Sequence, residues 1–423
     1  MLDTLKSLAA LFLSYGLFLT ASGLFTTLLG VRTTIEKFPT ELTGVVMASY
    51  FFGLLLGARY SVRVVSIAGH IRSFALFASV MSITALVHVL VINPPAWMAA
   101  RMVSGFCMAG LVMVTESWFN TRAPTAVRGR ILSLYMGTTY LAGGLGQFLL
   151  PLADPSQFHL FSAVSIIFSL ALVPVLVTRA PAPPPSEPVA VDMRELFRVS
   201  PVGVTGAFIA GLANSSFYAL GPVYARNIGL DVAQISLFMA AGIFCGLLLQ
   251  WPMGRLSDRV DRRLVIIAAG ACTGIACIAL VAAPVEFFVL QCVLIGCYGS
   301  FAFTIYSLSC AHTNDQARPD RLVQTASGLL TAYGVGAVCG PLLAALTMGQ
   351  LGDRGLFVTS AAAAACLAAF TAARIKRRAP VPGHRKEKFV PMPQTPTAKE
   401  LYAAMRNTRD RDMARLIGGV RRH

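Results

Sequence analysis

The chain has 423 residues, of which 56% are hydrophobic and 13% are charged. Soluble domains carry about 25% charged residues, so this composition excludes an ordinary soluble protein and indicates that most of the chain lies in lipid. The formal net charge of +16 would also suit a nucleic-acid-binding surface, and the positions of the basic residues decide between the two interpretations.

Twelve apolar runs, separated by charged and turn residues, are predicted to be membrane-spanning helices. A hydrocarbon core of about 30 Å requires about 20 helical residues. The first run follows Lys6, but it exceeds the roughly 7–15 apolar residues of a signal peptide and lacks a convincing cleavage site, so it is predicted to be a retained helix. The second run is the shortest. In chain order the runs cover 7–30, 43–58, 73–92, 97–118, 131–152, 158–178, 203–225, 233–252, 264–283, 287–310, 323–348 and 355–373.

The basic residues lie mostly on one side of this topology. With the N-terminus inside, the inner loops hold 16 Lys and Arg residues and the outer loops hold four, before a further 14 from Arg374 to the C-terminus. This positive-inside pattern predicts a multi-pass protein of the bacterial inner membrane with both termini in the cytoplasm. The net charge therefore reports topology, and no nucleic-acid partner is expected.

A proline-rich segment divides the chain into two halves of six helices. The predicted parts are an N-terminal bundle (1–178), a cytoplasmic linker (179–202), a C-terminal bundle (203–375) and a basic cytoplasmic tail (376–423). The stretch 130–137 recurs as 321–328, as expected of parallel transporter repeats. The tail is predicted to be loose in the cytoplasm, with a helix over 398–417. It is either a solvated segment without a specific role, which is the favoured interpretation, or a segment whose basic side chains contact anionic membrane lipids.

No cluster of residues suited to catalysis or metal binding is evident. All nine cysteines lie in apolar runs without CxxC spacing and are predicted to be packing residues, so no metal, cofactor or redox role is expected. The six histidines are scattered, whereas an integral-membrane enzyme would need acids or histidines gathered near one face. The chain also lacks the G-x-x-x-x-G-K-[ST] loop of ATP-driven pumps.

Residues 250–263, QWPMGRLSDRVDRR, resemble the loop signature of the major facilitator superfamily. Five residues fill the pattern and are expected to act in gating or coupling: Gly254, Asp258, Arg259, Arg262 and Arg263. The matching loop of the first half keeps Gly57 but has Ser61 where the family has aspartate. Arg101-Met-Val-Ser-Gly105 resembles the superfamily's arginine-then-glycine element on helix 4.

Together with VTESWFN, GLGQFLL and YGVGAVCGPLL, these segments make the chain up to about residue 375 resemble the YcaD-like subfamily of these permeases. The resemblance implies an all-α fold of two six-helix bundles, rocker-switch alternating access, a monomer, and a central cavity lined by helices 1, 4, 7 and 10. The Gly-Pro element that antiporters of the superfamily carry in helix 5 is missing, which disfavours a drug-efflux pump.

Two ionisable residues, Arg101 and Glu116, lie within the apolar run of helix 4. Such groups cost at least about 2.5 kcal/mol at mid-helix and are therefore candidates for function. Glu116 is interpreted as a gate residue that pairs with Arg59 or Arg63. The alternatives are a proton carrier, which would make protons a second cargo, and a helix-end carboxylate held by Arg122. Arg101 would hold an anionic group of the solute or modulate a carboxylate, or else extend to the outer head groups.

The predicted solute site combines amides, hydroxyls and aromatic rings at mid-membrane depth, with almost no charge. Such a lining suits a small neutral or weakly charged solute that contains a ring. Asn214 is the strongest candidate, because an unpaired amide in the bilayer is unfavourable. The candidates are Thr20, Ser22, Tyr140, Gln147, Asn214, Ser215, Tyr218, Tyr298, Phe301 and Tyr333.

The sequence therefore favours a secondary transporter, not an enzyme, whose direction of transport stays open. One alternative within this class is a proton-coupled efflux pump for drugs or metabolites. The alternative from another class is an integral-membrane enzyme or a sensor on a permease fold.

Overall fold

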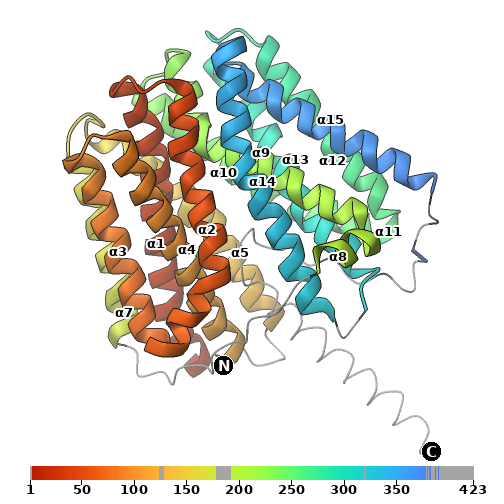
Figure 1. The fold of residues 1–423 in the computed structure, drawn as a ribbon, viewed down its shortest axis with the longest axis horizontal. Helices are drawn as coiled ribbons and strands as arrows, with labels where there is room; N and C mark the ends of the chain where they lie inside the picture. Colours follow the sequence, from red (N-terminus) through yellow and green to blue (C-terminus); the bar gives the residue numbers. More distant parts are fainter. Residues whose placement is uncertain are drawn as a thin grey trace, which may run out of the picture.

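The structure, a computed structural model, describes residues 2–122, 128–177, 192–318, 321–377, 379, 381–382, 386 and 389. Within helices, the side chains of 2–8, 120–122, 128–130, 132 and 323 are not described. The proline-rich part of the predicted linker and the predicted helix over 398–417 lie outside the described residues. The described residues are almost entirely helical and form two bundles, which lie side by side in Figure 1.

The first bundle contains six spans, two of which are interrupted. The chain breaks into a 3₁₀ turn at Gly146, before Pro151, and again at Ala171. Its elements are α1 (Leu2–Ile35), α2 (Thr40–Ala68), α3 (His70–Leu90), α4 (Pro94–Arg122), α5 (Arg128–Leu145) with η2 (Gly146–Leu152), and α6 (His159–Leu170) with α7 (Leu172–Val177).

The second bundle repeats this arrangement after a short surface helix, α8 (Met193–Val199), which is bent by 113° from the next helix. The side chain of Asp192 caps α8 by accepting hydrogen bonds from the backbone N–H groups of Arg194 and Glu195. The spans are α9 (Pro201–Asn227), α10 (Val232–Leu248) with α11 (Gln250–Arg259), α12 (Arg262–Ala282), α13 (Phe288–Asn314), α14 (Leu322–Leu351) and α15 (Gly355–Ile375).

Ten helices in the described part of the chain are long and apolar enough to cross a membrane, and α9 with α8 gives an eleventh. The segment α5–η2, which is less apolar, lies between α1 and α10 and occupies the remaining position of a twelve-span fold. The shortest predicted run, 43–58, is in fact part of the 29-residue helix α2. It extends past Arg59 and Arg63 because both side chains are exposed at its end and interrupt nothing.

We call the end where α2, α11 and α13 finish the basic end. The two bundles contact each other from the opposite end to the middle of the spans. Gly30 of α1 faces Pro222 of α9, and Gly44 of α2 packs against Pro341 of α14. The hydroxyl of Ser236 in α10 donates a 2.7 Å hydrogen bond to the backbone oxygen of Gln147 in η2. From these contacts α2 and α14 diverge toward the basic end (Figure 1).

Candidate functional site

Arg101 is buried in the first bundle. The residue is 1% exposed. Its guanidinium carbon lies 4.2 Å from the ring centroid of Tyr50 and 5.9 Å from that of Phe25. Among the described residues no acid pairs with it, and its Nε and Nη2 atoms make no hydrogen bond. The alternative in which Arg101 extends to the outer head groups is therefore wrong, and cation–π contacts hold the charge instead.

The position of Arg101 follows from the close crossing of α2 and α4. A Cβ atom built on Gly53 would lie 1.9 Å from the backbone oxygen of Met102, and one on Gly105 would lie 1.9 Å from that of Tyr50. Only glycine allows the two backbones to approach this closely. Gly105 lies one helical turn after Arg101 and lets α2 approach α4 closely. The ring of Tyr50 on α2 therefore contacts the guanidinium of Arg101.

Asn214 and Tyr333 meet where the second bundle faces the first. Asn214 of α9 is 0% exposed, and in the described part of the chain its amide interacts with the phenol of Tyr333 but makes no close hydrogen bond. The phenol of Tyr333 in α14 lies beside this amide, and two phenols of the first bundle, Tyr50 and Tyr140, are close enough to affect Tyr333 electrostatically. Tyr50 itself lies beside the hydroxyl of Ser22 in α1.

An aromatic cluster continues this surface. The ring of Tyr218 in α9 stacks on Phe303 of α13 with centroids 5.6 Å apart, and Tyr140 of α5 lies 6.3 Å from the same ring. The side-chain nitrogen of Gln250 donates a 3.2 Å hydrogen bond to the hydroxyl of Tyr140. Phe301 is half-buried beside the second bundle's core. The structure thus brings predicted aromatic residues from both bundles together.

Four other predicted residues have hydrogen bonds within the protein, which a packing role explains. The amide of Gln147 accepts a 2.6 Å hydrogen bond from Thr27 and donates two of 3.2 Å to backbone oxygens. The hydroxyls of Thr20, Ser215 and Tyr298 also donate to backbone oxygens. The hydrogen-bonding capacity of these side chains is therefore met more fully within the protein than that of Asn214.

Tyr50, Gln250 and Phe303 were not among the predicted residues, although they link the predicted ones. The resemblance directed attention to helices 1, 4, 7 and 10, and Tyr50 lies on helix 2. One signal was available: Tyr50 precedes Gly53 by three residues, on the face where a small residue admits a neighbouring helix.

Glu116 lies at the centre of a polar network in the first bundle. Tyr135 of α5 donates a 2.5 Å hydrogen bond to Oε1 of Glu116, and the hydroxyl of Tyr15 donates a 3.0 Å hydrogen bond to that of Tyr135. Tyr306 of the second bundle is close enough to interact electrostatically with Glu116. Arg59 and Arg63 are exposed on α2, so their pairing with Glu116 stays a prediction for another conformation.

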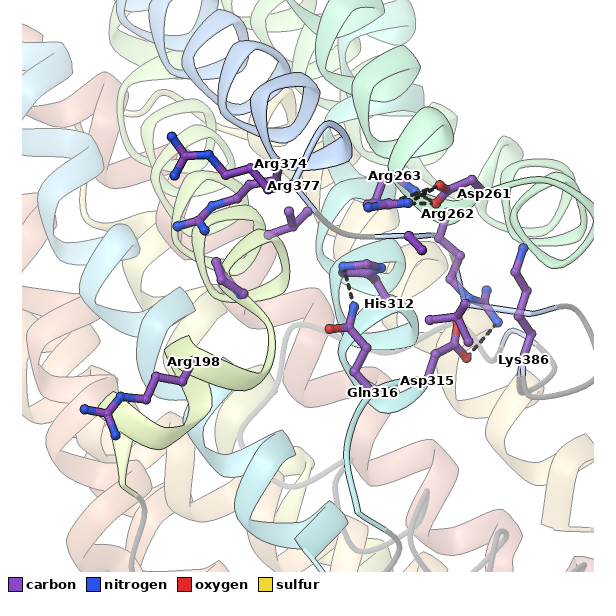
Figure 2. Close-up of a pocket in the computed structure, with 14 residues that line it drawn as sticks. Arg198, Asp261, Arg262, Arg263, His312, Asp315, Gln316, Arg374, Arg377 and Lys386 are labelled. Atoms are coloured by element: carbon purple, nitrogen blue, oxygen red, sulfur yellow. Dashed lines mark hydrogen bonds and ion pairs between the residues drawn. The ribbon is translucent and has the colours of Figure 1, made fainter.

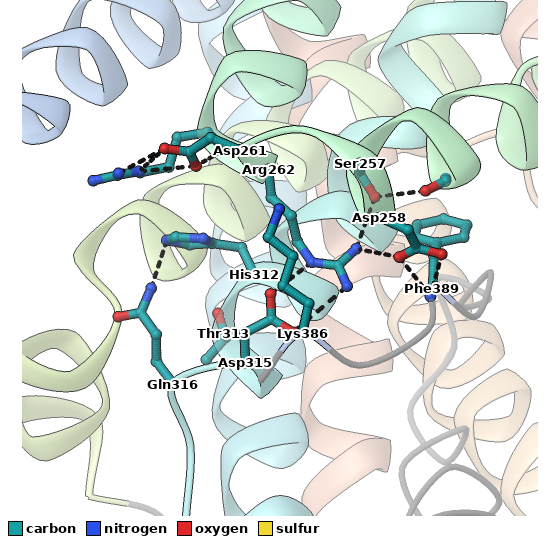
Figure 3. Close-up of polar contacts among 12 residues, drawn as sticks. Ser257, Asp258, Asp261, Arg262, His312, Thr313, Asp315, Gln316, Lys386 and Phe389 are labelled. Atoms are coloured by element: carbon teal, nitrogen blue, oxygen red, sulfur yellow. Dashed lines mark hydrogen bonds and ion pairs between the residues drawn. The ribbon is translucent and has the colours of Figure 1, made fainter. Parts of the chain in front are cut away.

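The loop signature forms a hydrogen-bonded cluster at the basic end of the second bundle (Figure 3). Arg262, 1% exposed, donates from Nε to Asp315 at 2.7 Å and from Nη1 to Ser257 at 2.7 Å, and it lies 3.1 Å from Asp258. Arg263 pairs with Asp261 at 2.6 Å. Arg259 is exposed.

The tail contributes two residues to this cluster. The backbone N–H of Phe389 donates to both carboxylate oxygens of Asp258, at 2.9 and 3.1 Å, and the Phe389 ring covers Gly254. The side chain of Lys386 donates to the backbone oxygen of Val260. The expectation of a loose tail is therefore wrong for these two residues, because Asp258 and the bare face of Gly254 hold them.

The described residues contain no group of three or more His, Cys, Asp or Glu side chains that could hold a metal ion. The nine cysteines form no disulfide bonds.

Comparison with known proteins agrees with this architecture. Residues 11–230 and 203–411 each match the profile of the Major Facilitator Superfamily. The chain is 29% identical over 343 residues to the uncharacterized MFS-type transporter YcaD of Escherichia fergusonii, covering 80% of this chain and 88% of that protein. It is 28% identical over 354 residues to an uncharacterized MFS-type transporter of Yersinia pestis, covering 82% and 90%.

The fold is also similar to those of solved transporters. The nucleoside transporter NupG superimposes with a TM-score of 0.72 at 14% identity, covering 88% of this chain and 99% of that chain. A bacterial homologue of the human lysosomal transporter Spinster, in an inward-facing and occupied conformation, gives 0.68 at 14% identity, covering 90% and 97%. From the two profile matches, which together span most of its length, the chain belongs to the major facilitator superfamily of membrane transporters.

Proposed function

We propose that this secondary transporter moves a small, neutral or weakly charged organic solute that contains a ring, and that it does so by alternating access between its two bundles. The observation that carries the proposal is the amide of Asn214, which is fully buried and, in the described chain, has only the Tyr333 phenol beside it, so most of its donor and acceptor capacity is unused. A buried amide without partners costs free energy unless something binds it.

The surroundings of Asn214 support the proposed solute class. The rings of Tyr218, Phe303 and Tyr140 provide faces on which a flat solute can stack. Arg101, in contact with Tyr50, supplies a buried positive charge for a weakly acidic group. We infer that the amide orients the solute and that the guanidinium favours a partial negative charge on it.

The contacts between the bundles support alternating access. The described contacts run from the end opposite the basic end to the middle of the spans, where Gln250 hydrogen-bonds Tyr140, and α2 and α14 diverge toward the basic end. We assign the basic end to the cytoplasm, because it carries most of the arginines of the inner loops. In this assignment we propose that the cytoplasmic ends of the bundles are apart in this conformation, and that the opposite conformation forms when the bundles rock together at the basic end.

Proton coupling is part of the proposal only through Glu116. This carboxylate is 1% exposed and lies near Tyr306 of the other bundle. A buried carboxylate between moving parts can act either as a gate residue or as a proton carrier. We favour the gate, in which Glu116 pairs with Arg59 or Arg63 when the basic end closes.

A ligand screen with two matched variants tests the solute site. Thermal unfolding of the purified protein would be measured at two pH values with nucleosides, flavins, sugars and aromatic acids. A ligand at 100 times its Kd adds about 2.7 kcal/mol to the free energy of unfolding. Asn214→Ala is expected to abolish the ligand-induced shift with little change in the melting temperature of the free protein.

Gln147→Ala is the control, because this second buried amide has its hydrogen bonds satisfied. It is expected to lower the melting temperature while keeping the ligand-induced shift. Retention of the full shift in Asn214→Ala would place the solute elsewhere. If no compound shifts the melt, and solute flux into proteoliposomes is also absent under imposed gradients, the transport proposal itself is wrong.

A further inference from the structure

A cavity of about 380 Å³ opens at the basic end of the second bundle (Figure 2). It lies between the first residues of α9 and α12, the last turns of α13 and α15, helix α8 and the tail. With His312 neutral, its lining carries four more positive than negative charges. The charged lining residues are Arg198, Arg262, Arg263, Arg374, Arg377, Lys386, Asp261 and Asp315.

Both carboxylates of the lining are already paired. Asp315 accepts a 2.7 Å hydrogen bond from Arg262, and Asp261 forms a 2.6 Å ion pair with Arg263. Burial would raise the pKa of Asp261, but the side-chain and backbone hydrogen bonds from Arg263 lower it below its usual value. Asp261 is therefore charged at neutral pH and balances the charge of Arg263. Asp315 balances the charge of Arg262 in the same way.

The remaining cations have no acid among the described residues to balance them. Figure 2 shows Arg198, Arg374 and Arg377 on the side of the cavity opposite the paired arginines. Arg198 and Arg377 are exposed, and Arg374 is half-buried with its guanidinium 5.1 Å from the ring centroid of Phe370. Arg374 and Arg377 lie one turn apart at the end of α15, so their charges repel each other. An anion between these side chains would relieve that repulsion.

We propose that this cavity binds a phosphate-bearing anion. Phosphate oxygens accept several charge-assisted hydrogen bonds at once, and the planar guanidinium group matches them in a bidentate geometry. The volume accommodates a phosphate group together with part of the molecule that carries it. Because the cavity lies at the ends of spanning helices, the phosphate belongs either to a soluble anion or to the head group of an anionic lipid. This cavity is distinct from the solute site at Asn214, so the two proposals are independent and each has its own test.

Thermal unfolding of the full-length protein in lipid nanodiscs tests the site. Inorganic phosphate would be compared with chloride at equal ionic strength in nanodiscs of neutral phosphatidylcholine. In a second arm, phosphatidylglycerol would replace part of the phosphatidylcholine without added phosphate. The double variant Arg374→Gln/Arg377→Gln is compared with Arg59→Gln/Arg63→Gln, which removes two exposed arginines from the same end of the first bundle, outside the cavity.

We expect phosphate or phosphatidylglycerol to raise the melting temperature of the wild type and of the Arg59→Gln/Arg63→Gln control. In Arg374→Gln/Arg377→Gln the apparent Kd should rise by at least about tenfold, which corresponds to about 1.4 kcal/mol. A shift with inorganic phosphate in neutral nanodiscs identifies a soluble anion, and a shift with phosphatidylglycerol alone identifies a lipid head group.

Equal shifts in the two double variants would overturn the proposal, because they would reflect general electrostatic attraction. The absence of any shift in both arms would overturn it as well. If Arg374→Gln/Arg377→Gln does not fold, the exposed Arg198→Gln on α8 provides the same comparison with the same expected direction.

Discussion

Tyr135 donates a 2.5 Å hydrogen bond to the carboxylate of Glu116, which lies on the preceding helix and is 1% exposed. A hydrogen bond to a charged group contributes about 1.5–3 kcal/mol. We therefore expect Tyr135→Phe to lower the free energy of unfolding by about that amount, as measured by thermal unfolding in detergent. Tyr15→Phe, which removes hydrogen bonds only to the neutral hydroxyls of Tyr135 and Thr139, should cost less. Equal melting temperatures for wild type and Tyr135→Phe would contradict this role.

The Glu116→Gln variant separates the gate from the proton carrier. If Glu116 pairs with Arg59 or Arg63 when the basic end closes, removal of its charge should slow transport and leave the pH dependence in place. Arg63→Gln should have a similar effect on the rate. The measurement is solute exchange and net uptake in proteoliposomes across a pH series. Loss of the pH dependence with exchange preserved would instead identify Glu116 as a proton carrier.

The α2–α4 crossing should tolerate no side chain at Gly53 or Gly105. An added Cβ would lie 1.9 Å from a backbone oxygen in either position, and a backbone atom cannot rotate away. The cost is expected to reach or exceed the upper end of the usual overpacking range of about 1–3 kcal/mol. Gly137→Ala is the control, because a Cβ there meets nothing within 4 Å, and it should stabilise α5 by about 0.5–1 kcal/mol. Similar melting temperatures for the alanine variants at 53 and 137 would refute this account.

Phe389→Ala should release the tail from α11. Its ring covers Gly254, and its backbone N–H binds Asp258. We expect faster amide hydrogen exchange over 250–259 in this variant, because less apolar surface and fewer hydrogen bonds protect the segment. Phe197→Ala, at an aromatic residue 41% exposed on α8, should leave the exchange unchanged. The same exchange rates in wild type and Phe389→Ala would show that the contact does not protect α11.

The sequence predicted the number and order of the spans well, because an apolar run long enough for a bilayer has few alternatives. Helix ends were predicted less well. The run 43–58 ended at Arg59, whereas α2 continues to Ala68, since an arginine at the exposed end of a helix does not terminate it. The break between α10 and α11 at Leu249 lies inside the predicted run 233–252, although Pro252 indicates it: this residue has no N–H to bond the carbonyl of Leu248.

The candidate site shows the same limit at the level of single residues. Arg101 could be identified from sequence because an ionisable residue in an apolar run is rare. Asn214 and Gln147 are both amides in apolar runs, and the sequence does not distinguish them. Their difference comes from residues on other helices: Thr27 of α1 makes a close hydrogen bond to Gln147, whereas the described part of the chain offers Asn214 only the phenol of Tyr333.

The close contact of α2 with α4, at Gly53 and Gly105, affects how the two helices can move. Because each glycine leaves the space into which the other backbone packs, we expect α2 and α4 to move together as one unit. α2 carries Tyr50, which faces the second bundle, and α4 carries both Arg101 and Glu116. Any displacement of α2 against α14 therefore shifts both buried ionisable groups together, although 15 residues separate them in the chain.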